Sequence, residues 1–294
     1  MNRVQANLLL LVTALIWGSA FVAQSQGMAD VGPMLFTGVR FLIGALVVVP
    51  LAWMEWCSLS RQGRALVRPD FFKIGGLGLL MLLGAAMQQI GIVSTSVTNA
   101  GFLTALYVPL VPLLSWLLLR HLPHWSVWPG ALACLIGAFL LSGAHELKIG
   151  VGDLWVIGSA LPWAVHVLMV GRVADRMAAP FLVASGQFLV CGLISLLWAF
   201  AAEPVSLAGL QAAAGPIAYT GVLSVGVAFT AQVVAQRYAQ ASDAAIILSA
   251  ETLFAAVFGY LLMGDRLNAA GIAGCGLILA SMLAIQLMPV LRRR

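Results

Sequence analysis

The stretch AIILSAETLFAAVFGYLL, residues 245–262, decides the fold class, because it is apolar enough to cross a membrane and contains a single charged side chain, Glu251. A helix of roughly 20 residues spans a hydrocarbon core of about 30 Å. Similar runs recur along the 294-residue chain, which is 62% hydrophobic and 9% charged. Soluble domains are nearer a quarter charged. We therefore predict an all-α integral membrane protein with no sizeable soluble domain.

Ten such runs are predicted as transmembrane helices, and the run 6–24 is interpreted as the first of them rather than as a signal sequence, since no soluble domain follows it. The ten approximate ranges are 6–24, 34–54, 71–92, 98–119, 127–143, 153–171, 180–201, 214–236, 243–263 and 269–289. Of the 15 Lys and Arg residues, twelve fall on the side of the termini, and only Arg40, Lys148 and Arg266 on the other. Because cytoplasmic segments are enriched in Lys and Arg, both termini are predicted to be cytoplasmic.

The two halves of the chain resemble each other when the sequence is shifted by about 144–147 residues. ALIW at 14–17 then matches ALPW at 160–163, RFL at 40–42 matches QFL at 187–189, and NAGFL at 99–103 matches DAAII at 243–247. We predict two five-helix repeats, residues 1–146 and 147–294. Because five is odd, the second repeat would enter the membrane from the opposite face, and such inverted repeats enclose a midplane site that rocking exposes to each side in turn.

This pattern, with GDRL at 264–267, resembles the EamA-type members of the drug/metabolite transporter superfamily over nearly the whole chain. WGSAF at 17–21 and SAE at 249–251 are similar to segments of the YddG-like amino acid exporters. Many members have the acidic residue of the ninth helix within LEP, whereas Thr252 replaces the proline here. The resemblance implies ten helices around a central cavity, export of amino acids or other small metabolites, and no cofactor.

Glu251, halfway along the ninth predicted helix, is the first candidate site residue. An ionised carboxylate costs roughly 2.5–3.5 kcal/mol at the centre of a membrane helix, so a cavity or a partner is expected. Glu251 would bind a substrate ammonium or exchange a proton; alternatively, it bridges two helices. Trp17 and Trp163 are related by the repeat and lie at similar predicted depth, where they would form the walls of a pocket or simply pack between helices.

Four further polar residues are candidates for substrate binding, each with a structural alternative. His166 follows Trp163 by one turn on the same helix face. Tyr107 takes the position of Glu251 in the first repeat, and its hydroxyl would bind substrate or bridge helices. Arg40 would hold a substrate carboxylate or extend toward the outer surface. Gln88, which pairs with Gln232 in the repeat, would lie at a gate or join two helices.

The catalytic and metal-binding patterns HExxH and GxSG are absent from the sequence, and so is an ATP-binding P-loop. The sequence therefore predicts a non-enzymatic secondary transporter of the bacterial cytoplasmic membrane that exports amino acids, aromatic ones included, or related metabolites by alternating access. The alternatives are efflux of other metabolites or drugs, and a channel-like facilitator. The predicted partners are the substrate and the lipid bilayer, without nucleic acid, and the chain is expected to act as a monomer.

Overall fold

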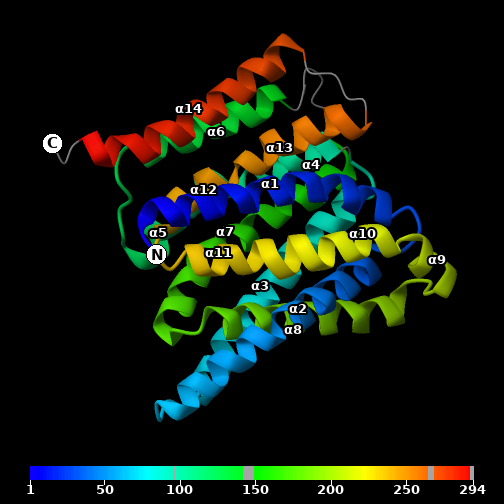
Figure 1. The fold of residues 1–294 in the computed structure, drawn as a ribbon. Helices are drawn as coiled ribbons and strands as arrows, with labels where there is room; N and C mark the ends of the chain where they lie inside the picture. The colour runs from blue at the N-terminus through cyan, green and yellow to red at the C-terminus, as the bar shows by residue number, and fades with distance from the viewer. Residues whose placement is uncertain (96, 142–148, 264–267, 292–294) are drawn as a thin grey trace.

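A computed structural model describes residues 1–95, 97–141, 149–263 and 268–291, and every regular element in these ranges is a helix (Figure 1). The elements in chain order are α1 (Arg3–Gly27), α2 (Pro33–Arg61), α3 (Arg68–Ile92), α4 (Val97–Thr104), α5 (Tyr107–Leu119), α6 (Val127–Leu141), α7 (Val151–Met177), α8 (Pro180–Ala202), α9 (Leu207–Ala212), α10 (Ala214–Tyr219), η1 (Thr220–Phe229), α11 (Thr230–Ala235), α12 (Ala241–Leu248), α13 (Ala250–Phe258), η2 (Gly259–Met263) and α14 (Ala269–Leu291). Lys148, Arg266, the GDRL segment and residues 292–294 lie outside the described residues.

The described part of the chain contains eight helical segments that are long and apolar enough to cross a membrane. Two shorter apolar helices, Val127–Leu140 and Ala269–Ala284, coincide with the fifth and tenth predicted segments. The all-helical membrane fold is thus confirmed, while the count of ten crossings stays a prediction. α6 and α14 lie side by side along one edge of the bundle, and α2 and α8 along the opposite edge (Figure 1).

The fourth and ninth predicted segments are each interrupted near their middle. In the first, α4 ends at Thr104 and α5 begins at Tyr107. The ring of Pro109 disfavours regular helix around the carbonyl of Ala105, four residues earlier, which accounts for a break at this point. In the second, Ser249 separates α12 from α13, and its hydroxyl donates to the carbonyl of Ile246 at 2.7 Å. Each of the two segments therefore places helix ends in the interior of the bundle.

α2 and α8 form an antiparallel pair in which each helix caps the other. The carboxylate of Glu203, at the end of α8, accepts hydrogen bonds from the backbone N–H groups of Met34 and Leu35 at 2.8 Å. Glu55, near the end of α2, likewise accepts hydrogen bonds from the backbone N–H groups of Phe181 and Leu182, the second and third residues of α8, at 2.9 Å. Proline occupies the first position of both helices, so these are the first N–H groups that need a partner. A carboxylate at a helix N-terminus also interacts favourably with the helix dipole.

Asp243 lies inside the first turn of α12, and its carboxylate accepts a hydrogen bond from Arg3 at 2.7 Å. Asn99, its counterpart in the sequence repeat, lies inside α4. α7 continues as a helix through Pro162.

Candidate functional site

A cavity of about 50 Å³ lies between the helices, where both interrupted segments meet α1, α2, α3, α7 and η1. This is space for a few water molecules, so a larger ligand requires neighbouring side chains to move. Six of the seven predicted site residues line it, and only His166 does not. The full lining is Trp17, Phe21, Gln24, Arg40, Gln88, Thr104, Tyr107, Trp163, Val167, Ser224, Phe229, Gln232 and Glu251.

Glu251 is the second residue of α13, directly after the interruption at Ser249. The side chain lines the cavity, yet the residue is only 5% exposed. Among the residues that the structure describes, its carboxylate has neither an ion-pair partner nor a hydrogen bond. The positive end of the α13 dipole favours a negative charge in this first turn. Glu251 is therefore a cavity-facing acid rather than a bridge between two helices, the alternative considered from the sequence.

Arg40 reaches the same cavity from α2 and is 3% exposed. Its Nη1 donates to Gln24 Oε1 at 2.7 Å, and its Nη2 donates to Gln89 Oε1 at 3.3 Å. The expectation that it extends toward the outer surface is wrong, because these two amide oxygens replace water as acceptors. Within the described ranges the guanidinium has no carboxylate partner, and its buried Nε has no acceptor. Arg40 therefore retains donor capacity next to the cavity.

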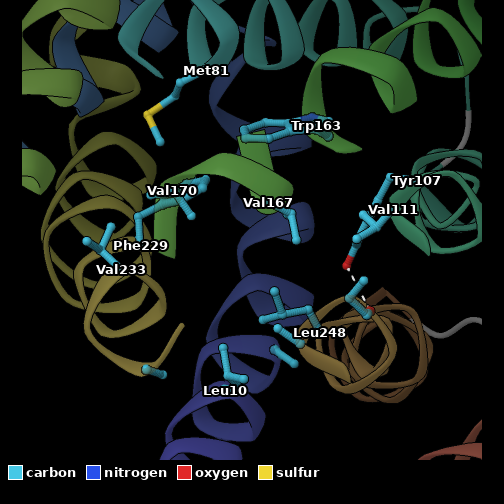
Figure 2. Close-up of a cluster of buried hydrophobic side chains, with 14 of the residues drawn as sticks. Leu10, Met81, Tyr107, Val111, Trp163, Val167, Val170, Phe229, Val233 and Leu248 are labelled. Carbon is cyan, nitrogen blue, oxygen red and sulfur yellow. Dashed lines mark hydrogen bonds between the residues drawn. The ribbon is translucent and has the colours of Figure 1, made fainter. Parts of the chain in front are cut away.

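Three aromatic rings form one wall of the cavity. Phe229 contacts both tryptophans, with ring centroids 4.4 Å from Trp17 and 5.8 Å from Trp163, and it stacks on the latter at an interplanar angle of 17°. The Trp17 Nε1 donates to the carbonyl of Ser224 at 3.3 Å. Sequence reasoning missed Phe229 and Ser224, since both lie on the π-helical segment η1, whose wider turn the composition does not reveal. Figure 2 shows Trp163 and Phe229 on neighbouring helices.

The amide and hydroxyl groups on the remaining walls are partly engaged within the protein. Gln88 Nε2 donates to Thr104 Oγ1 at 2.8 Å, joining α3 to α4. Tyr107 Oη points to the carbonyl of Ala245 at 3.5 Å, a long hydrogen bond (Figure 2). Gln232 lines the same cavity, and its buried Oε1 has no donor within the described ranges. Gln88 and Gln232, which the repeat pairs, thus line one cavity.

His166 lies behind the aromatic wall instead of on the cavity surface. It is fully buried, its Nε2 is 2.9 Å from Gln187 Oε1, and its ring meets the edge of Trp163 with centroids 5.9 Å apart. The expectation that Trp163 and His166 reach the same cavity is thus not met in this conformation. Three residues advance an α-helix by about 300°, which is about 60° short of a full turn, and this difference directs His166 toward Gln187 on α8.

No group of three or more His, Cys, Asp or Glu side chains that would suit a metal ion occurs in the described part of the chain. The four cysteines are free thiols. The cavity thus offers one acid, one guanidinium, aromatic faces and amides, which are groups for holding a small polar molecule by ion pairs, hydrogen bonds and stacking.

Apolar helices around an internal cavity with buried charged walls place this chain among multi-pass membrane proteins that bind small polar molecules. The model of the EamA-like transporter family matches residues 4–143 and again residues 150–287, and the chain belongs to this family. It is a membrane transporter of small molecules. The family part of the sequence-based resemblance is confirmed, whereas the specificity of YddG-like amino acid exporters stays a prediction.

Several known proteins are similar over most of their length. An uncharacterized transporter of Archaeoglobus fulgidus is 29% identical over 97% of this chain and 87% of its own. The S-adenosylmethionine/S-adenosylhomocysteine transporter of Chlamydia trachomatis is 23% identical over 92% of this chain and 88% of its own. A crystal structure with 22% sequence identity superposes with a TM-score of 0.77 over 98% of both chains; at this identity it supports the fold alone.

Proposed function

We propose that this protein is a secondary transporter that exports amino acids, aromatic ones included, or closely related zwitterionic metabolites by alternating access. The observation that carries the proposal is the pair of opposite, uncompensated charges in one cavity. Arg40 and Glu251 are both almost fully buried, and neither has an oppositely charged partner among the described residues. Buried charges are strongly unfavourable unless they are paired. A zwitterion supplies a carboxylate for Arg40 and an ammonium for Glu251.

The aromatic wall favours a substrate with an apolar or aromatic side chain. Trp17, Phe229 and Trp163 offer faces for stacking and for cation–π contact with the ammonium. The relative named for S-adenosylmethionine gives a second candidate, because that compound ends in an amino acid group and carries an adenine that stacks on aromatic rings. The small cavity volume favours the smaller substrates.

Alternating access requires two halves of opposite orientation, which we infer for residues 1–146 and 147–294 with five crossings each. The inference is supported by packing, because contacts between the halves occur in matching pairs. α1 packs on α13 as α7 packs on α4 and α5, and α2 packs on η1 as α3 packs on α8. The N-terminus and the end of α14 lie at the same end of the bundle (Figure 1). With the positive-inside distribution, this end faces the cytoplasm. The cavity is built from one chain, so a monomer suffices.

Counterflow with purified protein in liposomes tests the proposal. Vesicles loaded with unlabelled phenylalanine should accumulate external labelled phenylalanine. Phenethylamine, which lacks the carboxylate, and 3-phenylpropanoate, which lacks the ammonium, should compete poorly. Accumulation separates a carrier from a pore, because a simple pore shows no trans-stimulation. Absence of counterflow across a panel of amino acids would refute the proposed substrate class, and S-adenosylmethionine is the next compound to test.

Glu251→Gln tests the role of the acid, since it keeps the shape and removes the charge. If Glu251 binds the ammonium, the variant should discriminate little between phenylalanine and 3-phenylpropanoate. If Glu251 exchanges a proton instead, counterflow of phenylalanine should persist while its dependence on pH is lost. Unchanged flux, unchanged selectivity and unchanged pH dependence together would remove Glu251 from the mechanism. Glu203→Gln, which changes a carboxylate outside the cavity, is the matched control.

A further inference from the structure

The central cavity extends unequally along the bundle. At the end where α1 finishes and α2 begins, it includes Gln24 and Arg40. At the opposite end, Val167 lines the cavity and also lines a second, more peripheral cavity of about 180 Å³. The walls of this second cavity include Arg172 and Gln236. Val167 is 4% exposed and is shared by the linings of both cavities, so we place it between the two spaces.

Unsatisfied polar atoms gather beside Val167. His166 Nδ1, Gln187 Nε2 and Gln236 Oε1 are buried and have no hydrogen-bond partner within the described ranges. An unsatisfied buried donor or acceptor costs about 1–3 kcal/mol. Such groups are uncommon in native structures, and each requires an explanation. Three of them on three neighbouring helices suggest a surface that receives polar atoms in another conformation.

The internal repeat relates this region to the Arg40 end of the cavity. RFL at 40–42 matches QFL at 187–189, so Gln187 on α8 is the counterpart of Arg40 on α2. Each side chain is bonded to the preceding long helix, Arg40 to Gln24 on α1 and Gln187 to His166 on α7. Arg40 faces the cavity, whereas Gln187 does not. The two counterparts are therefore in different environments in this one conformation.

We propose that His166, Gln187 and Gln236 form a second half-site, which opens when the Arg40 end closes and then holds the polar group that Arg40 holds here. The inference rests on the proposed alternating-access function and deepens it by assigning the residues of the opposite state. These three side chains are neutral amides and an imidazole, so they bind a carboxylate more weakly than a guanidinium does. An exported substrate would meet this half-site first and pass to Arg40.

One hydrogen bond and one close backbone contact between α7 and the end of α11 hold the half-site closed toward the second cavity. Gln236 Nε2 donates to the carbonyl of Val167 at 2.9 Å, joining the end of α11 to α7. Close beside this bond, α7 passes the backbone of Gln236 at Gly171, where an added Cβ would lie 2.8 Å from Gln236 Cβ. Only glycine permits this approach. Gly171→Ala should therefore separate the two helices and favour the state in which the half-site is open.

Thiol labelling tests the half-site without knowledge of the substrate. Cys57, Cys134, Cys191 and Cys275 are first replaced by Ala in the full chain, and Gln187→Cys is added. A charged, membrane-impermeant methanethiosulfonate is applied to either face of vesicles of known orientation. If the opposite state holds about 1–10% of the molecules, the thiol should react at about that fraction of the rate of an exposed thiol. Reaction should occur only from the face that bears the N-terminus, and Gly171→Ala should accelerate it several-fold.

Ser195→Cys is the matched control, because Ser195 is also fully buried on α8 and its hydroxyl also has no partner within the described ranges. It lies two turns farther from the proposed opening and should react more slowly than Gln187→Cys from that face. Both variants must elute and melt like the cysteine-free parent, and His166→Cys replaces Gln187→Cys if the latter does not. Equal rates at both positions, or reaction of Gln187→Cys only from the opposite face, would overturn the half-site.

The outcome is separable from that of the proposed substrate class. Labelling in the expected pattern without amino acid counterflow would keep the half-site and reject the substrate. Counterflow without labelling would keep the substrate and reject the half-site.

Discussion

Replacement of Arg40 is the most informative perturbation of the proposed binding site. Its terminal nitrogens each already donate one hydrogen bond, to Gln24 and Gln89, whereas Nε has no acceptor. A substrate carboxylate would therefore bind to Nε and to the second hydrogen of one terminal nitrogen. Hydrogen bonds to charged groups contribute about 1.5–3 kcal/mol each, so the pair is expected to contribute about 3–6 kcal/mol.

Arg40→Met should remove both bonds and weaken phenylalanine binding by ~100-fold or more. Arg40→Lys keeps the charge but loses the planar fork, so it should lose one bond, about 1.5–3 kcal/mol or ~10–150-fold. Phenethylamine has no carboxylate, and its weak binding should change little. Affinities are measured by displacement of labelled phenylalanine from purified protein, and half-saturating concentrations by counterflow.

A control variant and a melting temperature distinguish the loss of the substrate contact at Arg40 from a general loss of positive charge and from unfolding. Arg64 is exposed, and Arg64→Met should leave affinity unchanged. In Arg40→Met, the oxygens of Gln24 and Gln89 lose their donor, so the melting temperature of the empty protein should be recorded alongside affinity. If Arg40→Met binds phenylalanine as tightly as the unaltered protein, or if it weakens phenylalanine and phenethylamine equally, Arg40 is not a carboxylate anchor.

Two pairs of substitutions have expected outcomes that follow directly from the packing. Gly18→Ala places a Cβ 2.5 Å from Phe254 Cβ and 2.8 Å from the Glu251 carbonyl oxygen; overpacking costs about 1–3 kcal/mol and should lower both melting temperature and counterflow. Gly101→Ala also faces α13, but its Cβ would lie at an ordinary 3.8 Å from the nearest atom. Gly101→Ala should therefore change melting temperature and counterflow less than Gly18→Ala does, and equal effects of the two variants would contradict the packing argument. Glu55→Gln and Glu203→Gln each weaken two hydrogen bonds at a helix start, and each should cost about 1 kcal/mol in thermal unfolding assays; full additivity of the two is expected because they lie at opposite ends of α2, and strong coupling would contradict it.

Hydropathy predicted the all-helical membrane fold because this fold follows from a requirement of the bilayer, whereas the orientation expected from charge and the inverted halves expected from repetition stay predictions. Every crossing must satisfy its own backbone, so long apolar runs become helices. Midspan polar residues are costly, so Trp17, Tyr107 and Glu251 were expected near a cavity, and all three line it. Six of the seven expected residues lie together, although substrate binding by them stays a prediction.

The errors have a common physical cause, which is helix rotation and neighbour contacts that periodicity does not encode. Arg40 was expected to extend outward, but Gln24 and Gln89 come from two other helices to meet it. Phe229 was missed because η1 winds as a π-helix, whose wider turn changes the directions of its side chains from those that an α-helical period predicts. α13 contains no proline after the interruption at Ser249, so the position of this interruption could not be derived from a proline rule.

Matched positions in the two halves of the sequence carry different side chains, so the two ends of the cavity differ in charge. Tyr107 and Glu251 occupy matching positions just after the two breaks, yet one is a neutral phenol and the other an acid. Arg40 and Gln187 match in the same way, one charged and one neutral. In each of these two matched pairs, only one member is charged. A substrate that needs both Arg40 and Glu251 is therefore held most strongly in the conformation described here, and its release requires the Arg40 end to lose contact with it.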